Sequence, residues 1–270
     1  LDTYTDRTFG WCAPLLQNVG ILPYTNYWIG FIHHTFDGTF SENNCENMFK
    51  SKLFLDSLPL CKGFFCLTEY LSKQIRERLK ILGYGIRVET LSHPTVFPEL
   101  NFTMERYINN KDKQLINVGS WYRNPITIHR VPEIKDIKLS TLRGKKMEAN
   151  FPTTEINVSI KGDVLHCDTN VWSRCFIKYI NGESDIYSKK IHKRIKESIG
   201  DKESINVKPF IMDFISRINV IETLPDDGYD KLLSENIVFL DLVDASVANT
   251  IIECIVRDTP IVVNRIPPTV

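Results

Sequence analysis

The segment from Asp244 to Glu253 holds the residues whose types and spacing are best suited to binding a phosphate-bearing ligand. Ser246, Asn249 and Thr250 lie at the start of a predicted helix, and Glu253 follows within its first turns. Unpaired backbone N–H groups at a helix start, with the helix dipole behind them, suit a phosphate group. Helix packing does not require an acid at position 253, so Glu253 is a candidate functional residue.

Two short apolar segments flank this helix and position it. Residues 237–242 and 260–264 have the length and β-branched content of buried parallel strands. The apolar positions between them recur at three and four residues, so we expect them to pack on the sheet. This stripe consists of Val247, Ile251, Cys254 and Ile255, whereas Asn249, Glu253 and Arg257 fall on another face. The helix then begins at the carboxyl end of a strand, where open α/β sheets bind ligands.

This order of residues resembles the donor-nucleotide element of GT-B glycosyltransferases, nearest to the retaining family 4 type. The pattern runs from Asp244 through Asn249-Thr250 and Glu253 to a Thr-Pro turn and a strand ending in Asn264-Arg265. The resemblance implies an α/β chain with two Rossmann-like domains facing a cleft. It also implies that Glu253 binds the ribose hydroxyls and that Asp244, Ser246, Asn249 and Thr250 lie beside the rest of the donor.

Two observations weigh against a direct transfer of these roles. The family often has a second glutamate eight positions before the ribose acid, where this chain has Ala245 with Asp244 beside it. Glu253 also lies four residues before Arg257, and a surface pair at that spacing contributes only about 0.3–0.5 kcal/mol. The structural alternative is therefore a simple helix ion pair.

A second candidate phosphate element follows the strand predicted at residues 114–119. Gly119 and Ser120 form its loop, and Arg123 comes shortly after. A glycine lets the backbone approach an anion, and a guanidinium can hold two phosphate oxygens at once. The resembled family has a glycine loop and basic side chains at this place. The alternative is an ordinary turn with a solvated arginine.

The first half of the chain offers residues for the acceptor side of the chemistry. His33, His34 and Asp37 follow a predicted strand at residues 27–32. A histidine or an acid in such a loop can position a hydroxyl, and imidazole transfers protons near neutral pH. The alternative is that one histidine ends the strand and the other is exposed. His93 is a further candidate in a later strand-end loop.

The periodicity divides the chain into an acceptor-side domain, residues 1–105, and a nucleotide-sugar-binding domain, residues 106–270. The polar segment 101–113 is the expected linker. Further strands are predicted at residues 63–67, 87–91, 137–144 and 218–224, and further helices at 69–82, 172–180, 187–199 and 229–233.

Composition excludes several other classes of protein. The 270 residues are 43% hydrophobic and carry 33 basic and 33 acidic side chains, so nucleic acid is not an expected partner. The seven cysteines are irregularly spaced, which favours reduced thiols and a cytoplasmic protein. No transmembrane segment or signal peptide is visible. The basic segment 187–199 is typical of a solvated helix face, with contact to lipid or nucleic acid as the alternative.

No metal site or cofactor is expected. The acids lack metal-ligand spacing, and no glycine-rich dinucleotide motif or P-loop is present. In the resembled family, the donor phosphate assists deprotonation of the acceptor. Arg123, Arg217 or Lys161, with the helix start, could neutralise the leaving diphosphate.

The sequence therefore predicts a glycosyltransferase, by resemblance a retaining one. Its partners would be a nucleotide sugar and a hydroxyl of a glycan or glycoconjugate, with peripheral membrane contact left open. The alternatives are a non-catalytic relative used for binding or assembly, and a nucleotide-sugar epimerase. The resembled enzymes also have elements at both ends that are not evident here, so a shortened chain is a further expectation. No oligomeric state is indicated.

Overall fold

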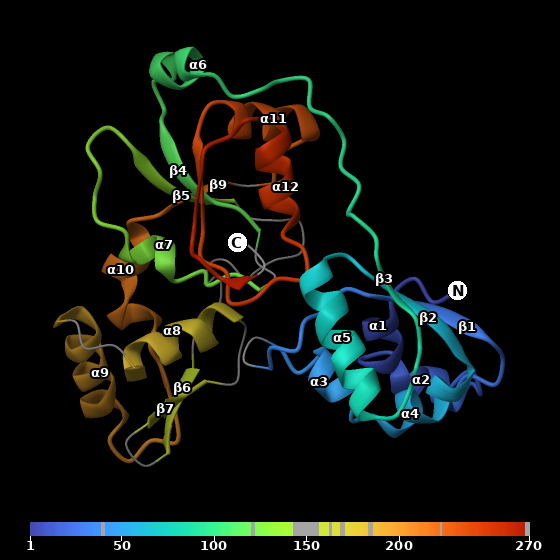
Figure 1. Ribbon diagram of the computed structural model, residues 1–270. Helices are drawn as coiled ribbons and strands as arrows, with labels where there is room; N and C mark the ends of the chain where they lie inside the picture. Colours follow the sequence, from blue (N-terminus) through green and yellow to red (C-terminus); the bar gives the residue numbers. More distant parts are fainter. Residues whose placement is uncertain are drawn as a thin grey trace. The chain divides into compact units, whose positions relative to one another are not determined.

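The computed structural model describes residues 1–38, 41–119, 122–142, 157–161, 164–167, 171–182, 186–221 and 223–267. The chain forms two compact units (Figure 1). Unit 1 contains residues 1–96 and 243–249, together with the described residues from Arg265 onward, and unit 2 contains residues 97–242 and 250–264. Each unit has its own parallel sheet, so the predicted α/β class is confirmed.

Unit 1 is built on three parallel strands in the order β1-β2-β3. They span Trp28–Ile32, Cys61–Cys66 and Val88–Thr90. The helices are α1 (Thr5–Phe9), α2 (Ala13–Asn18), α3 (Cys45–Met48), α4 (Lys52–Ser57) and α5 (Glu69–Ile81), with a 3-10 turn at Leu58–Leu60. The helix predicted at residues 69–82 is confirmed as α5, in which Leu71, Ile75 and Leu79 are fully buried, whereas Leu82 after its end is 38% exposed. Gly83 has a left-handed φ of +80° just after this helix.

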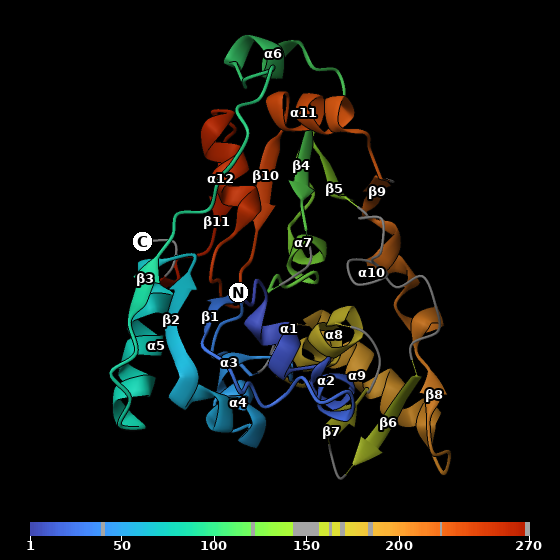
Figure 2. The ribbon, with the colours of Figure 1, turned by 90° about the vertical axis from the view of Figure 1, so that its right-hand side faces the viewer.

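Unit 2 contains five parallel strands in the order β11-β10-β4-β5-β9, which Figure 2 shows side by side. They span Gln114–Asn117 (β4), Lys138–Leu142 (β5), Asn219–Ile221 (β9), Ile237–Leu240 (β10) and Ile261–Val263 (β11). The chain order on the sheet is that of a doubly wound fold, and it reverses between β4 and β10. A ligand is expected at the carboxyl ends of these two strands.

Four helices belong to the parallel sheet and its approach segment. They are α6 (Met104–Asn109), α7 (Thr127–Arg130), α11 (Asp226–Ser234) and α12 (Asn249–Val256). The segment expected as a linker, residues 101–113, belongs to unit 2, contains α6 and is hydrogen-bonded to the rest of that unit. The backbone N–H of Phe102 donates to the carbonyl of Arg257 at 2.7 Å, and the side chain of Asn110 donates to the carbonyl of Glu235 at 3.1 Å.

A small α/β layer is inserted between β5 and β9. Strands β6 (Asn157–Lys161), β7 (Val164–His166) and β8 (Ile205–Asn206) form an antiparallel sheet in the order β7-β6-β8. It is accompanied by α8 (Val171–Gly182), α9 (Ile186–Ile199), a 3-10 turn (Lys208–Phe210) and α10 (Met212–Ser216). The apolar side of the predicted basic helix is buried here through Ile191, Ile195 and Ile199, while Lys189, Lys190 and Lys193 are exposed.

The packing face predicted for α12 is confirmed only in part. Cys254 is fully buried as expected, but Ile255 is 66% exposed, and Thr250 and Arg257, which lie outside the predicted stripe, are buried. Arg257, in the turn directly after α12, points inward because its guanidinium pairs with the carboxylate of Asp230 in α11. A paired cation can occupy a packed face that hydrophobic periodicity would assign to apolar residues.

Candidate functional site

The loops at the switch point of unit 2 are fixed to one another by polar contacts. The backbone N–H of Asn124 donates to the carbonyl of Asp241 at 2.8 Å, and the Thr127 hydroxyl donates to its carboxylate at 2.6 Å. Asn264, after β11, exchanges two hydrogen bonds with the backbone of Leu242, at 2.7 and 2.8 Å. The loops at the carboxyl ends of β4, β10 and β11 are therefore held together by hydrogen bonds.

Gly119 and Arg123 make a compact element at this edge. Gly119 has a φ of +77°, and a Cβ atom there would lie 2.8 Å from Cζ of Arg123. Arg123 is only 8% exposed, and its Nη2 donates to the hydroxyl of Thr250 in the first turn of α12 at 3.0 Å. Burial lowers the pKa of this guanidinium, while the nearby Tyr229 and Glu253 act in the opposite direction. Three predicted site residues thus meet here, and Ser120 lies outside the described residues.

Glu253 lies one turn beyond Thr250 on α12, and its carboxylate accepts a hydrogen bond from Tyr229 of α11. The distance from the phenol oxygen to Oε2 is 2.6 Å. Burial, and then the charge of Glu253, raise the pKa of Tyr229 well above its ordinary value, so the phenol remains a donor. The helix ion pair considered from the sequence is not formed. Arg257 donates to the backbone carbonyl of Glu253 at 3.1 Å and pairs with the carboxylate of Asp230.

The structure distinguishes the two adjacent histidines of unit 1. His34 is 1% exposed and has a partner at each ring nitrogen. Its Nδ1 lies 2.5 Å from the carbonyl oxygen of Asn43 and must donate to it, while Nε2 lies 3.0 Å from the hydroxyl of Tyr4. Trp11 stacks on the ring at a centroid distance of 5.8 Å. His34 is therefore part of the folded core of this loop.

His33, in contrast, has a side chain that is 32% exposed. Its Nδ1 is buried and lies 3.6 Å from Oδ2 of Asp6, a residue of α1. The side chain of Asp6 is only 3% exposed, and it accepts the backbone N–H groups of His33 and His34 at 2.7 and 3.1 Å. Asp6 was not identified from the sequence, because no local pattern connects it with a loop 27 residues later.

The remaining predicted residues of unit 1 fall into two small groups. The Ser246 hydroxyl donates to the backbone carbonyl of His33. Asp244 and Asp37 both act electrostatically on Tyr70, whose pKa is raised first by burial and then by Asp244. Unit 1 thus brings Ser246 to the histidine loop. Asn249, the first residue of α12, is exposed.

Two other basic residues proposed from the sequence lie away from the switch point. Lys161 ends β6 of the inserted layer. Arg217 donates to the carbonyl of Val131 at 3.0 Å and to that of His129 at 3.4 Å, just after α7. Neither residue contacts the loops after β4 and β10 in the part of the chain that the structure describes.

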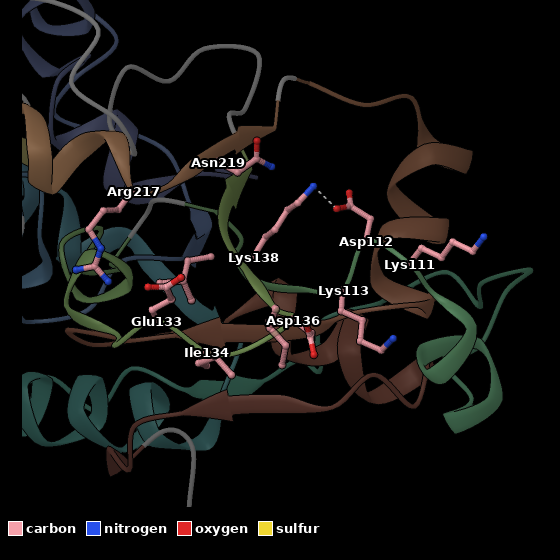
Figure 3. A pocket seen from close by; sticks show the side chains of 11 residues that line it. Lys111, Asp112, Lys113, Glu133, Ile134, Asp136, Lys138, Arg217 and Asn219 are labelled. Carbon is pink, nitrogen blue, oxygen red and sulfur yellow. Dashed lines mark ion pairs between the residues drawn. The ribbon is translucent and has the colours of Figure 1, made fainter.

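Arg217 lines a surface cavity of about 600 Å³ beside the starts of β4, β5 and β9 (Figure 3). This is the opposite end of the sheet from the switch point. Three of its cations already have protein partners, because Lys138 pairs with Asp112, Lys113 donates to the carbonyls of Ile108 and Asn110, and Arg217 donates to two further carbonyls. The cavity is therefore not the better candidate for a phosphate site.

The described part of the chain contains neither a cluster of metal-binding side chains nor a helix that could span a membrane. Over the ranges that the structure describes, no three or more His, Cys, Asp or Glu side chains are grouped closely enough to hold a metal ion. No helix in the same ranges has the length and apolar character needed to cross a bilayer.

No family model matches this sequence, and no curated protein matches it significantly. Among solved structures, the chain is similar to the pneumococcal O-GlcNAc transferase GtfA in complex with UDP and GlcNAc, with 11% identity, a TM-score of 0.45, and coverage of 90% of this chain and 38% of that one. It is also similar to an α,α-trehalose-phosphate synthase (UDP-forming) from Burkholderia vietnamiensis, with 9% identity, a TM-score of 0.44, and coverage of 93% and 54%.

A third similar structure is a glycosylation-associated protein complex, Gap123, from Streptococcus agalactiae, with 12% identity, a TM-score of 0.35, and coverage of 96% of this chain and 46% of that one. The chain therefore spans between about two fifths and just over half of the length of these three proteins.

Proposed function

We propose that this chain is a glycosyltransferase of the GT-B type, in which unit 2 binds a nucleoside-diphosphate sugar and unit 1 binds an acceptor hydroxyl of a glycan or glycoconjugate. One observation carries the proposal. A buried guanidinium, Arg123, lies under Gly119 at the switch point of a doubly wound sheet and is hydrogen-bonded to Thr250 at the start of α12. This is the position at which such sheets bind phosphorylated ligands.

The diphosphate would lie against Arg123 and the first turn of α12. A guanidinium that has already lost most of its hydration has little more to lose when an anion arrives, and a dry site strengthens the attraction. Backbone N–H groups of the helix start supply further donors without reorganisation. The same groups would stabilise the nucleoside diphosphate as it leaves, without a metal ion or a cofactor.

The ribose would lie against Glu253. Tyr229 occupies Oε2 of this carboxylate, while no described residue donates a hydrogen bond to Oε1. A ribose hydroxyl can therefore donate to Oε1 without breaking an existing contact. Because Tyr229 stays protonated, it also keeps the carboxylate in one orientation.

In unit 1, His33 is the better candidate than His34 for contact with the acceptor. A third of the His33 side chain is accessible, whereas both ring nitrogens of His34 have protein partners. Retention of the anomeric configuration and a cytoplasmic location complete the proposal, the first from the resemblance and the second from the irregular spacing of the seven cysteines.

Titration calorimetry with UDP, GDP, dTDP and CDP tests the donor site. We expect one nucleotide to bind, and Glu253→Ala to weaken it at least about tenfold, which corresponds to about 1.4 kcal/mol. Glu105→Ala is the matched control, because Glu105 is an exposed glutamate on α6 of the same unit. Equal affinity in the two variants would remove Glu253 from the site.

A non-catalytic binding function is the second candidate, and Ala245 favours it. This residue is 4% exposed and carries no carboxylate where the resembled enzymes often have one. Release of nucleoside diphosphate from a nucleotide sugar, including slow transfer to water, distinguishes a transferase from a binding protein. Recovery of an epimerised donor would instead identify an epimerase.

A further inference from the structure

Asp6 is a buried carboxylate in α1. Its two oxygens accept the backbone N–H groups of His33 and His34, and Oδ2 also faces Nδ1 of the His33 ring at 3.6 Å. A carboxylate with a 3% exposed side chain is costly to bury unless its contacts serve the folded state. The two hydrogen bonds and the ring contact of Asp6 are all made with His33 and His34, in the loop after β1.

The backbone of His33 is held on both sides. Asp6 accepts its N–H, and the hydroxyl of Ser246 donates to its carbonyl. The ring itself packs on Tyr4, with the centroids 4.6 Å apart. Asp6, Ser246 and Tyr4 therefore fix the backbone and the ring plane of His33, so that the protein determines the orientation of the imidazole.

We propose that Asp6 is a positioning residue that holds neutral His33 in the Nδ1–H tautomer and leaves the Nε2 lone pair as the acceptor for a substrate hydroxyl. The acceptor in this statement rests on the proposed function, whereas the tautomer does not. At 3.6 Å the contact from Nδ1 to Oδ2 is longer than a hydrogen bond, but a carboxylate at that distance still favours a proton on the nitrogen that faces it. Such contacts often shorten when a ligand binds.

His34 supplies an internal standard for this assignment. A backbone carbonyl can only accept, so the 2.5 Å contact to Asn43 requires a proton on Nδ1 of His34. Its Nε2 accepts from Tyr4 and is shielded by Trp11. The two neighbouring histidines should therefore have the same tautomer for different reasons, and only that of His33 should depend on Asp6.

Long-range ¹⁵N–¹H correlation spectra of the histidine rings test the proposal directly. They would be recorded at about pH 8.5, above the ordinary imidazole pKa of about 6.5, with His33 assigned from a His33→Gln variant. We expect the Nδ1–H pattern for His33 in the wild type, a shift toward the Nε2–H pattern in Asp6→Asn, and no change in Asp56→Asn, an α4 residue whose carboxylate pairs with Lys52. The wild-type spectrum needs no variant to fold, and an Nε2–H pattern in it would overturn the proposal.

A kinetic measurement separates this role from the proposed function. Asp6→Asn should lower turnover of the nucleotide sugar at least about tenfold while the dissociation constant of the nucleoside diphosphate stays the same. Wild-type turnover in a folded Asp6→Asn variant would contradict the positioning role. If the wild type binds no nucleotide, the proposed function fails, and the tautomer of His33 still decides the role of Asp6.

Discussion

At the scale of single residues, Gly119 is required by two separate effects. Its φ of +77° lies in the left-handed region, and its missing Cβ leaves space for the guanidinium of Arg123. Gly83 isolates the first effect, because it has a φ of +80° and no atom within 4 Å of a Cβ position. The two glycines therefore allow strain and steric exclusion to be measured separately.

We expect Gly83→Ala to lower the free energy of unfolding by about 1–2 kcal/mol, the ordinary cost of a left-handed alanine. Gly119→Ala should cost more, by roughly 1–3 kcal/mol, because Arg123 must move within a packed site. Urea denaturation of both variants gives the difference. Nucleotide affinity should fall in Gly119→Ala and stay unchanged in Gly83→Ala. If the two variants have the same stability and the same nucleotide affinity, Arg123 does not need the space beside Gly119.

Tyr229 is a second residue with a measurable role. In Tyr229→Phe, the carboxylate of Glu253 loses the phenol that donates to it at 2.6 Å. A hydrogen bond to a charged group contributes about 1.5–3 kcal/mol, so the free energy of unfolding should fall by roughly that amount. Nucleotide binding should weaken as well, because the carboxylate is no longer held in one orientation. Tyr107→Phe on α6 is the control, and a Tyr229→Phe variant with wild-type stability and affinity would exclude this role.

At the scale of elements, an ion pair joins α11 to the turn that directly follows α12. Nη2 and Nε of Arg257 lie 2.5 and 3.1 Å from one oxygen of Asp230, and the arginine is 8% exposed. Removing one partner of such a pair leaves a buried charge without compensation, which is the expensive case.

Asp230→Ala should therefore lower the free energy of unfolding by about 3–5 kcal/mol. The double variant Asp230→Ala, Arg257→Met should recover part of this loss, because methionine retains the packing of the side chain without the charge. Urea denaturation of the single and double variants measures how much of the lost free energy of unfolding is recovered. If the double variant is no more stable than the single one, the contribution of Arg257 lies elsewhere, for example in its bond to the carbonyl of Glu253.

Elements with a regular local pattern could be predicted from the sequence. The strands β1, β2, β4, β10 and β11 and the helix α5 lie within or close to the expected ranges, because apolar periodicity, caps and turn residues are local signals. The burial of Arg257 after α12 could not be predicted, since it depends on Asp230 from another helix. The antiparallel strands β6, β7 and β8 were also missed, because they are short and pair across a long insertion.

In the candidate site as well, some residues could be predicted from local sequence signals and others could not. Gly119, Arg123 and Thr250 could be proposed because each lies beside a recognisable strand end or helix start. Asp6 and Tyr229 could not, because their partners are 27 and 24 residues away along the chain and only the fold brings them together. Sequence reasoning could propose the elements of the candidate site, and the structure was needed to find the residues that hold those elements in position.

At the scale of the whole molecule, both units bury thiols that resist ionisation. Burial raises the pKa of Cys61 and Cys66 in unit 1, and of Cys254 in unit 2, to about 12 from an ordinary value of 9.0. The folded state therefore retains protons that the unfolded chain releases above pH 9.0. The free energy of unfolding must fall as pH rises through the interval from 9.0 to about 12, because the native state binds more protons there.

Alkaline sensitivity is accordingly the prediction for the intact chain. Urea denaturation at a series of pH values between about 7.5 and 10.5 should show a flat region followed by a decline that begins near the ordinary thiol pKa of 9.0. Cys61→Ala should make the decline shallower, because one group that titrates only in the unfolded state has been removed. A free energy of unfolding that stays constant or rises across this pH range would mean that the thiols ionise in the folded protein. Water would then reach the thiols more readily than their burial indicates.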